Sequence, residues 1–517
     1  MGAFFLSVKP ESARIPRARI KALLREQGFR NFVEIADDGL YLVYCNKIAD
    51  TGAGSVYIED PDNFCIVTGT LIYCRRFGAK AAEQLFNDLA IDDLDTSELF
   101  GNFAILIRIK GSLRLYSDLQ GIYSIWHDAG LSTFSSSFLA IARTSTGLTP
   151  NVQGIYEYAF QEASLGGETV ISEARRLRVN KAIAFDPHPR EILALSAPQE
   201  STASVDRQYH LDRIRGQLRR QFDAISECFS GQVNSALSGG FDSRLVLALC
   251  RQSGITPRLH VYGHSQSDDV RIAREICNGE GLSLQHEDKS ATGRFSPEDF
   301  AETVRQNYLS FHGHCPDGIL ENGSDLRTRK NKLGDSRLLL NGGGGEVFRN
   351  FFYLRDREYS IEQLLWCFFS QFDPRCCTAE FNEADWYAAI NEKIADLTGT
   401  RSILSRRLIE YLYAGFRCTY WMGMNNSINN QFGWFMTPLA DANTTWAAHD
   451  IPIDMKSYGS FEADLISSID PTLAGYPSAY GFDFQESVSW RHKIAAQSTI
   501  LRPPLLRRFT FRLKHRR

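Results

Sequence analysis

Ser235-Ala-Leu-Ser-Gly-Gly-Phe-Asp-Ser-Arg-Leu-Val-Leu247 is the stretch that decides the fold of this chain. A short, mostly apolar segment, residues 233–237, stops at Ser238-Gly239-Gly240, and an amphipathic segment follows over residues 243–251. This order predicts a strand, a tight glycine turn and a helix. Backbone N–H groups at such a turn attract an anion, and the dipole of the following helix adds to the attraction.

The side chains of this turn suit the phosphates of a nucleotide. Gly239 and Gly240 let a phosphate approach the backbone closely, and Ser238 and Ser243 add hydroxyl donors. Asp242 supplies carboxylate oxygens, which are ligands that Mg²⁺ prefers. The Gly-Lys-Ser/Thr ending of a Walker loop is missing from this stretch, so phosphoryl transfer of the Walker type is not indicated.

A second apolar strand that ends in glycines lies further along the chain. Residues 338–341 are followed by four glycines, residues 342–345, and then by Glu346. A glycine run lets backbone pass close to a ligand and places one acid beside it. If the two strands are neighbours, Asp242 and Glu346 can share one Mg²⁺ that bridges ATP phosphates. The alternative is a flexible loop before a helix, in which Glu346 only interacts with the helix dipole.

The remaining chain predicts two domains with different patterns, residues 1–200 and 205–517. Up to residue 200, short apolar runs separated by turn residues predict antiparallel strands, with one helix over residues 79–90. After a linker-like stretch, strand and helix patterns alternate up to residue 341, which is typical of a parallel sheet covered by helices. Residues 359–447 have aromatic residues at helical spacing and predict a helical C-terminal part.

Composition and charge limit the classes of function. With 517 residues, 43% hydrophobic and 23% charged, the chain is an ordinary globular protein of about two domains. A net charge of −4 argues against general binding of nucleic acid. The 11 cysteines show no Cys-x-x-Cys spacing, so neither a zinc site nor a disulfide framework is indicated. No transmembrane run or signal-peptide pattern is visible, so a cytoplasmic location is expected.

Together the two glycine loops resemble those of the asparagine synthetase / β-lactam synthetase family, which belongs to the pyrophosphate-loop ATP pyrophosphatases. The resemblance implies Mg²⁺ bound by Asp242 and by Glu346, which replaces the family's Asp. Asp269 with Ala273 is similar to a helix of the family, and residues 437–441 are similar to a late segment. The implied nucleotide-binding residues are Leu237, Ser238, Gly239, Gly240, Asp242, Ser243, Tyr262, Gly263 and Gly344.

The first domain resembles the family's glutaminase domain on residues 99–104, 117–121 and 133–136. A glutaminase of this kind uses a cysteine directly after the initiator Met, activated by its own α-amine. Position two here is Gly2, and no cysteine precedes Cys45. The domain is therefore expected to be a retained scaffold without glutaminase activity.

The expected fold is thus α/β and α+β. It combines an N-terminal αββα sandwich, similar to the N-terminal-nucleophile hydrolases, with an α/β parallel-sheet synthetase domain whose C-terminal part is helical.

The family's catalytic lysine has no clear counterpart. Lys493 and Lys456 are candidates, and Arg244 and Arg349 beside the loops are alternative sources of positive charge. An isolated Lys or Arg is more often solvated than catalytic. Position 343, where relatives carry Glu or Tyr, is Gly343.

The expected function is that of an ATP-dependent, AMP-forming amide ligase without its own glutaminase. A substrate carboxylate attacks the α-phosphate, pyrophosphate leaves, and an amine or ammonia then attacks the acyl-adenylate. Two alternatives stay open: an asparagine synthetase that uses ammonia or glutamine, and a non-catalytic nucleotide-binding scaffold. ATP and Mg²⁺ are the expected cofactors, and a small carboxylate and an amine are the expected partners. Nucleic acid is not an expected partner, no transmembrane segment is expected, and a homodimer is left open.

Overall fold

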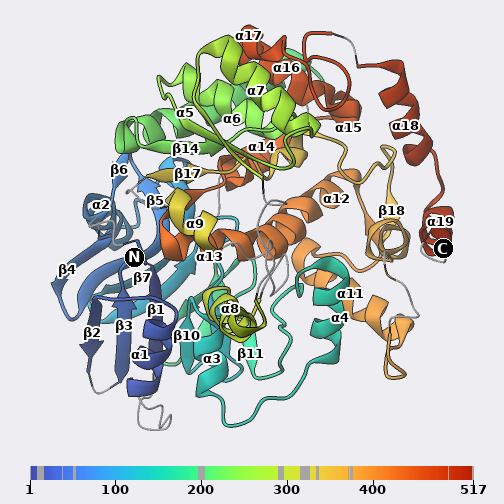
Figure 1. Cartoon of the computed structure of the whole chain (residues 1–517). Helices are drawn as coiled ribbons and strands as arrows, with labels where there is room; N and C mark the ends of the chain where they lie inside the picture. The colour runs from blue at the N-terminus through green and yellow to red at the C-terminus, as the bar shows by residue number, and fades with distance from the viewer. Residues whose placement is uncertain are drawn as a thin grey trace.

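A computed structural model of the chain describes residues 2–8, 17–37, 39–49, 54–195, 204–288, 296–314, 326–333, 337–370, 372, 377–486 and 488–514. It is a mixed α/β structure with two antiparallel sheets, one parallel sheet, a small two-stranded sheet and many helices (Figure 1). The mixed α/β class predicted from the sequence is confirmed at this level. No helix in the described ranges is both long and apolar enough to cross a membrane.

The N-terminal part contains the two antiparallel sheets. The first has the strand order β11-β9-β10-β1-β3-β2, and the second has the order β13-β12-β8-β7-β5-β4, with β6 paired to β5. The strands of the first sheet are β1 (Ala3–Val8), β2 (Phe32–Ala36), β3 (Leu40–Cys45), β9 (Trp126–Asp128), β10 (Thr133–Ser135) and β11 (Ala174–Arg176). Those of the second are β4 (Val56–Asp60), β5 (Asn63–Tyr73), β6 (Arg76–Phe77), β7 (Leu99–Ile109), β8 (Ser112–Ser117), β12 (Lys181–Ala184) and β13 (Arg190–Leu193).

Side-chain alternation along these strands builds four layers. Phe4 and Leu6 of β1 point into the core between the two sheets, where they meet Ile66 of β5. Phe5 points to the other face, against α1 (Arg17–Glu26) and α3 (Phe138–Thr144). On the far side, α2 (Ala79–Ala90) covers the outer face of the second sheet. The bounds of α2 confirm the helix predicted over residues 79–90.

The parallel sheet follows, with the order β16-β15-β14-β17-β20. From β14 (Val233–Ala236) the chain adds β15 (Arg258–Tyr262) and β16 (Leu284–Glu287) on one side. It then crosses back to place β17 (Leu338–Leu340) and β20 (Trp434–Met436) on the other side of β14. The strand order therefore reverses between β14 and β17, and open α/β sheets bind ligands at such a reversal, beyond the carboxyl ends of the strands.

Helices accompany this sheet and form most of the C-terminal part. They are α5 (Arg207–Phe229), α6 (Phe241–Gln252), α7 (Asp268–Glu280), α8 (Pro297–Ser310), α9 (Leu326–Leu333), α10 (Ile361–Leu364), α11 (Glu383–Thr398), α12 (Arg406–Leu412), α13 (Gly423–Phe432), α14 (Ala442–His449), α15 (Ile453–Lys456), α16 (Ser460–Ile469), α17 (Pro471–Ala474), α18 (Trp490–Ile500) and α19 (Pro504–Lys514). Helix α4 (Val152–Gln161) precedes them, in the N-terminal part of the chain. A π-helical segment, η6 (Tyr413–Met422), joins α12 to α13 without a break.

The prediction of an all-helical stretch over residues 359–447 is wrong in part. The segment also contains β18 (Tyr359–Ser360), β19 (Ile403–Leu404) and β20, which adds a parallel strand beside β17. The three side chains of β20 are all buried, so its sequence shows no polar–apolar alternation by which a strand could be recognised.

The N-terminal sheet and β20 are joined by buried hydrogen bonds. The backbone N–H of Phe435 donates to the Thr70 hydroxyl at 3.0 Å, and that hydroxyl donates to the Asn430 amide oxygen at 2.7 Å. The backbone N–H of Thr437 donates to the Asn102 amide oxygen at 3.2 Å. Strands β5 and β7 therefore supply acceptors for the free side of the last strand of the parallel sheet.

Candidate functional site

The two glycine loops lie side by side at the carboxyl ends of β14 and β17. These strands pair in parallel, with Ser235 opposite Leu340. A Cβ atom added at Gly342 would come within 2.9 Å of the carbonyl carbon of Asp242 and the nitrogen of Ser243, so the two backbones are in direct contact. The structure thus brings the two predicted loops together at the point where the strand order reverses.

Internal hydrogen bonds fix the first loop. The Ser238 N–H donates to the Ser243 hydroxyl at 2.9 Å, and the two serine hydroxyls lie 3.0 Å apart. The Gly239 N–H donates to Asp269 at 2.8 Å. The Gly240 N–H donates to the Ser238 hydroxyl at 3.3 Å, so three of the expected anion-binding N–H groups are used within the protein, although the N-cap of α6, Gly240, has no side chain that could cap the helix. Sequence reasoning missed the contact of Asp269 with the loop, because it joins residues on different strand–helix units.

Three carboxylates converge on Arg349. Its Nη2 atom lies 2.8 and 2.9 Å from the two oxygens of Asp242 and 3.5 Å from Glu346 Oε1. Its Nε atom lies 3.2 Å from Oε2 of Glu462, a fully buried residue of α16. Because Asp242 and Glu346 contact the same nitrogen, their carboxylates are well within the roughly 10 Å that one hydrated ion could bridge.

Burial dominates the electrostatics of this cluster. It raises the pKa of Asp242, although the charge of Arg349 acts in the opposite direction. It also raises the pKa of Glu462, and the nearby charge of Asp242 adds to that effect. For Arg349, burial acts to lower the pKa, but the carboxylates of Asp242, Glu462 and Glu346 hold it well above its usual value. Arg349 is thus a firmly protonated cation among the acids.

The donor set fits a divalent cation that phosphates help to bind. Asp242 and Glu346 are the partly exposed acids of this cluster, and their carboxylate oxygens are hard ligands of the kind that Mg²⁺ prefers. In the part of the chain that the structure describes, no group of three or more His, Cys, Asp or Glu side chains is arranged to hold a metal by itself. Mg²⁺ commonly takes only one or two protein carboxylates and completes its shell with phosphates and water. Asp242 and Glu346 would supply those carboxylates, at the place that Arg349 occupies in this structure.

The other predicted nucleotide-binding positions surround the two loops. Tyr262 and Gly263 lie at the end of β15, the neighbour of β14, and the Nζ atom of Lys332 lies 3.2 Å from the centre of the Tyr262 ring. Gly344 has a φ of 95°, and a Cβ there would lie 2.8 Å from the nitrogen of Ala440. The second loop therefore packs on the predicted segment 437–441.

Of the four candidate cations, Arg349 contacts the acids and the other three are used differently. The Arg244 guanidinium is fully buried and donates to the carbonyls of residues 473, 476 and 477. Lys456 is fully buried and pairs with Glu410 at 3.2 Å. Lys493 is exposed on α18, and within the described residues no hydrogen bond or ion pair links it to either loop. These three positions give no support to a direct role beside the phosphates.

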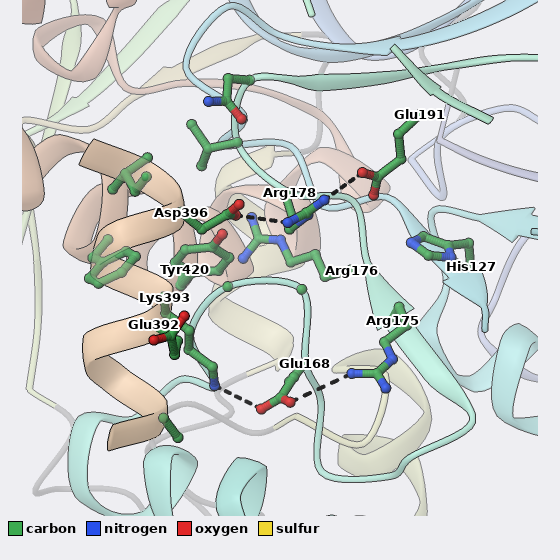
Figure 2. A pocket seen from close by; sticks show the side chains of 17 residues that line it. His127, Glu168, Arg175, Arg176, Arg178, Glu191, Glu392, Lys393, Asp396 and Tyr420 are labelled. Atoms are coloured by element: carbon green, nitrogen blue, oxygen red, sulfur yellow. Dashed lines mark hydrogen bonds and ion pairs between the residues drawn. The ribbon is translucent and has the colours of Figure 1, made fainter. Parts of the chain in front are cut away.

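Two cavities are relevant to binding. The larger, about 500 Å³, lies between the segment around β11 and helix α11, and none of its lining residues belongs to the glycine loops (Figure 2). Ion pairs connect its walls: Arg178 lies 2.8 Å from Asp396, and Lys393 lies 2.8 Å from Glu168 (Figure 2). The smaller, about 370 Å³, is lined in part by the second loop, at Asn341, Gly343 and Glu346.

Comparisons with known proteins leave the family of the chain open. No protein-family model and no curated protein matches it. Among solved structures, glutamine phosphoribosylpyrophosphate amidotransferase from B. subtilis, complexed with ADP and GMP, shares 9% identity over 55% of this chain, with a TM-score of 0.26. The chain spans 65% of that protein's length, just under two thirds. A structure described as the allosteric regulatory enzyme of purine biosynthesis shares 9% identity over 66% of this chain and 74% of its own, with a TM-score of 0.26. Likeness of this degree carries no functional argument.

Gly2 leaves no room for a nucleophilic side chain. A Cβ at this position would lie 2.7 Å from the carbonyl oxygen of Asn46 and 2.8 Å from the Cα of Lys47. We expect the purified chain to release no glutamate from glutamine above background, and Gly2→Cys to release none either, because backbone occupies that space. A coupled glutamate assay measures this. Steady release by the unaltered chain would mean that another nucleophile is present.

Lys332 predicts a pH dependence of stability. Burial lowers the pKa of Lys332 to about 7, whereas an unfolded lysine has a pKa of about 10.4. Between these values the folded state binds fewer protons than the unfolded state, so the free energy of unfolding rises with pH over that window. Lys332→Met should flatten this rise and stabilise the protein at pH 7. Urea denaturation at pH 7 and pH 9 measures both effects, and Lys330→Met, an exposed position of the same helix, is the control. Equal pH dependence in both variants would contradict the prediction.

Proposed function

We propose that the chain is an ATP-dependent, AMP-forming ligase that activates a carboxylate and joins it to an amine or ammonia, without glutaminase activity of its own. One observation carries the proposal: the serine–glycine loop and the glycine–glutamate loop meet where the sheet order reverses, with Asp242 and Glu346 facing one cation. That position in an open α/β sheet is where phosphate-bearing ligands bind. The four-layered N-terminal part supports its role as a glutaminase-like scaffold.

Each part of the site has a role in this chemistry. The hydroxyls of Ser238 and Ser243 and the uncapped start of α6 bind the leaving pyrophosphate. Arg349 offsets the negative charge that develops during attack on the α-phosphate. Mg²⁺, when held by Asp242 and Glu346, would neutralise phosphate charge. Most of the rate enhancement then comes from positioning and from fixed charges rather than from a covalent intermediate on the protein.

Product analysis tests the proposal. The purified protein is incubated with ATP, Mg²⁺ and a panel of carboxylic acids, and exchange of labelled pyrophosphate into ATP is measured. The expected result is exchange that depends on a carboxylate, with AMP as the nucleotide product once an amine is added. Aspartate with ammonia is included in the panel, since asparagine synthesis is one case of the same reaction. Formation of ADP, or tight ATP binding without exchange with any acid, would overturn the ligase assignment.

A second candidate is a nucleotide-binding protein without ligase chemistry. It is favoured by the position of Arg349, which fills the space between the two proposed metal ligands. The exposed position of Lys493 points the same way. Nucleotide binding that is insensitive to Mg²⁺, combined with no exchange, is the outcome that supports this candidate.

A further inference from the structure

The smaller cavity lies directly beside the second glycine loop. On one side it is lined by Asn341, Gly343 and Glu346 of that loop. On the other side it is lined by a helical stripe that includes Tyr413, Arg417, Trp421 and Asn425. At about 370 Å³ it falls at the small end of the range for pockets that take small molecules.

One continuous helix supplies this stripe. Residues 413–422 are π-helical and run directly into α13, so side chains four residues apart face the cavity. Stretches of π-helix are uncommon in proteins, and those that occur are often found at functional sites. Tyr413 at the start of the stripe donates a hydrogen bond to Glu346, which links the helix to the glycine loop. The cavity wall is therefore tied to the proposed nucleotide site.

Much of the cavity lining is apolar or aromatic. Phe351, Trp421 and Met422 contribute to it. A Cβ atom at Gly343 would lie 3.1 Å from both the sulfur and the methyl carbon of Met422, so any larger residue there would reduce the space. The absence of a side chain at Gly343 keeps this part of the cavity open for a flat or branched apolar group.

The cavity also presents a positive charge. The guanidinium carbon of Arg417 lies 3.9 Å from the centre of the Trp421 ring, which holds the side chain in place. Its ion pair with Glu162 is long, at 3.7 Å, and the Glu162 side chain is 56% exposed, so water weakens that pair. Arg329 adds a second cation to the lining and donates to the side-chain oxygen of Asn425 at 2.6 Å.

We propose that this cavity binds the acid substrate of the ligase, and that this substrate has an aromatic or branched apolar body and an anionic group paired with Arg417. This inference rests on the proposed function, because the bound acid is a substrate only if the neighbouring loops bind ATP for a ligase reaction. The apolar body packs against Trp421 and Met422, and a carboxylate can take two hydrogen bonds from one guanidinium. A second acidic group of the same molecule then lies toward Glu346 and the nucleotide.

Direct binding tests the inference without any catalytic step. Isothermal titration calorimetry is performed with phenylsuccinate, with succinate, which lacks the ring, and with phenethylamine, which lacks the acid. Phenylsuccinate should bind, and the other two should bind at least about tenfold more weakly. Arg417→Gln and Trp421→Leu should each weaken phenylsuccinate binding about tenfold or more, and Arg417→Lys should recover part of the loss. Equal binding by Arg417→Gln and the unaltered protein, or no binding of phenylsuccinate, would overturn the inference.

Two controls separate the possible failures. Arg491 and Trp490 form a matched arginine–tryptophan pair on the surface. The guanidinium carbon of Arg491 lies 5.4 Å from the centre of the Trp490 ring, and Trp490 is 67% exposed. Arg491→Gln and Trp490→Leu should leave phenylsuccinate binding unchanged, and loss in these variants counts against the cavity. Binding of a non-hydrolysable ATP analogue is measured in parallel. If phenylsuccinate binds and the nucleotide does not, the cavity is supported and the ligase assignment is wrong. If the nucleotide binds and phenylsuccinate does not, the nucleotide site is supported and the inference about the cavity is wrong.

Discussion

Asp242→Ala is expected to abolish ATP–pyrophosphate exchange, by at least about a thousandfold, while the protein still folds. The substitution removes the carboxylate that faces the second loop, and with it one of the two proposed Mg²⁺ ligands. It removes little core volume, since the Asp242 side chain is 23% exposed. Exchange assays at saturating ATP measure the loss, and circular dichroism checks the fold.

An acid in an equivalent helical position serves as the control. Asp268 lies in the first turn of α7, is 66% exposed, and pairs only with nearby Arg271 at 3.0 Å among the bonds described. Asp268→Ala should exchange pyrophosphate at the rate of the unaltered protein. A folded Asp242→Ala variant with normal exchange would remove Asp242 from the chemistry altogether.

Arg349→Met is expected to cause the largest loss of stability. The Arg349 side chain is 18% exposed and forms ion pairs with Asp242, Glu346 and Glu462. Its removal leaves the fully buried Glu462 and the partly exposed Asp242 and Glu346 without a counter-charge, which should lower the free energy of unfolding by several kcal/mol, on the order of a broken buried ion pair. Mg²⁺ should raise the melting temperature of this variant by more than it raises that of the unaltered protein. The reason is that the ion can then bind between Asp242 and Glu346, where Arg349 lies in the unaltered protein.

Thermal unfolding with and without Mg²⁺ measures both parts of this expectation. Arg357→Met is the control, because Arg357 is exposed and lies over the ring of Tyr359. It should change neither stability nor the response to Mg²⁺ appreciably. If Mg²⁺ affects Arg349→Met and the unaltered protein equally, Asp242 and Glu346 do not share a metal.

Local sequence patterns were sufficient for the elements that hold the glycine loops. The change from an apolar run to glycines and then to an amphipathic segment predicts β14, the loop and α6 to within two residues. The helix over residues 79–90 is reproduced by α2. These signals are local, because both periodicity and turn chemistry are properties of neighbouring residues.

The missed parts of the site depend on contacts between distant segments. Glu462 lies in the first turn of α16, where an acid is expected simply to interact with the helix dipole. Its place beside Asp242 follows from the packing of α16 on α6, which no spacing in the sequence encodes. Likewise, Arg349 is recognisable as a nearby cation, but the three acids that surround it come from three separate segments.

The hydrogen bonds between the N-terminal sheet and β20 give the first part of the chain a structural role that does not depend on any chemistry of its own. β20 is an edge strand, and an edge with free N–H groups is a template on which other chains can add. Thr70 and Asn102 accept from the backbone of Phe435 and Thr437 and so occupy that template. The N-terminal part therefore covers this edge of the parallel sheet, and residues 205–517 produced alone are expected to associate with other chains through it.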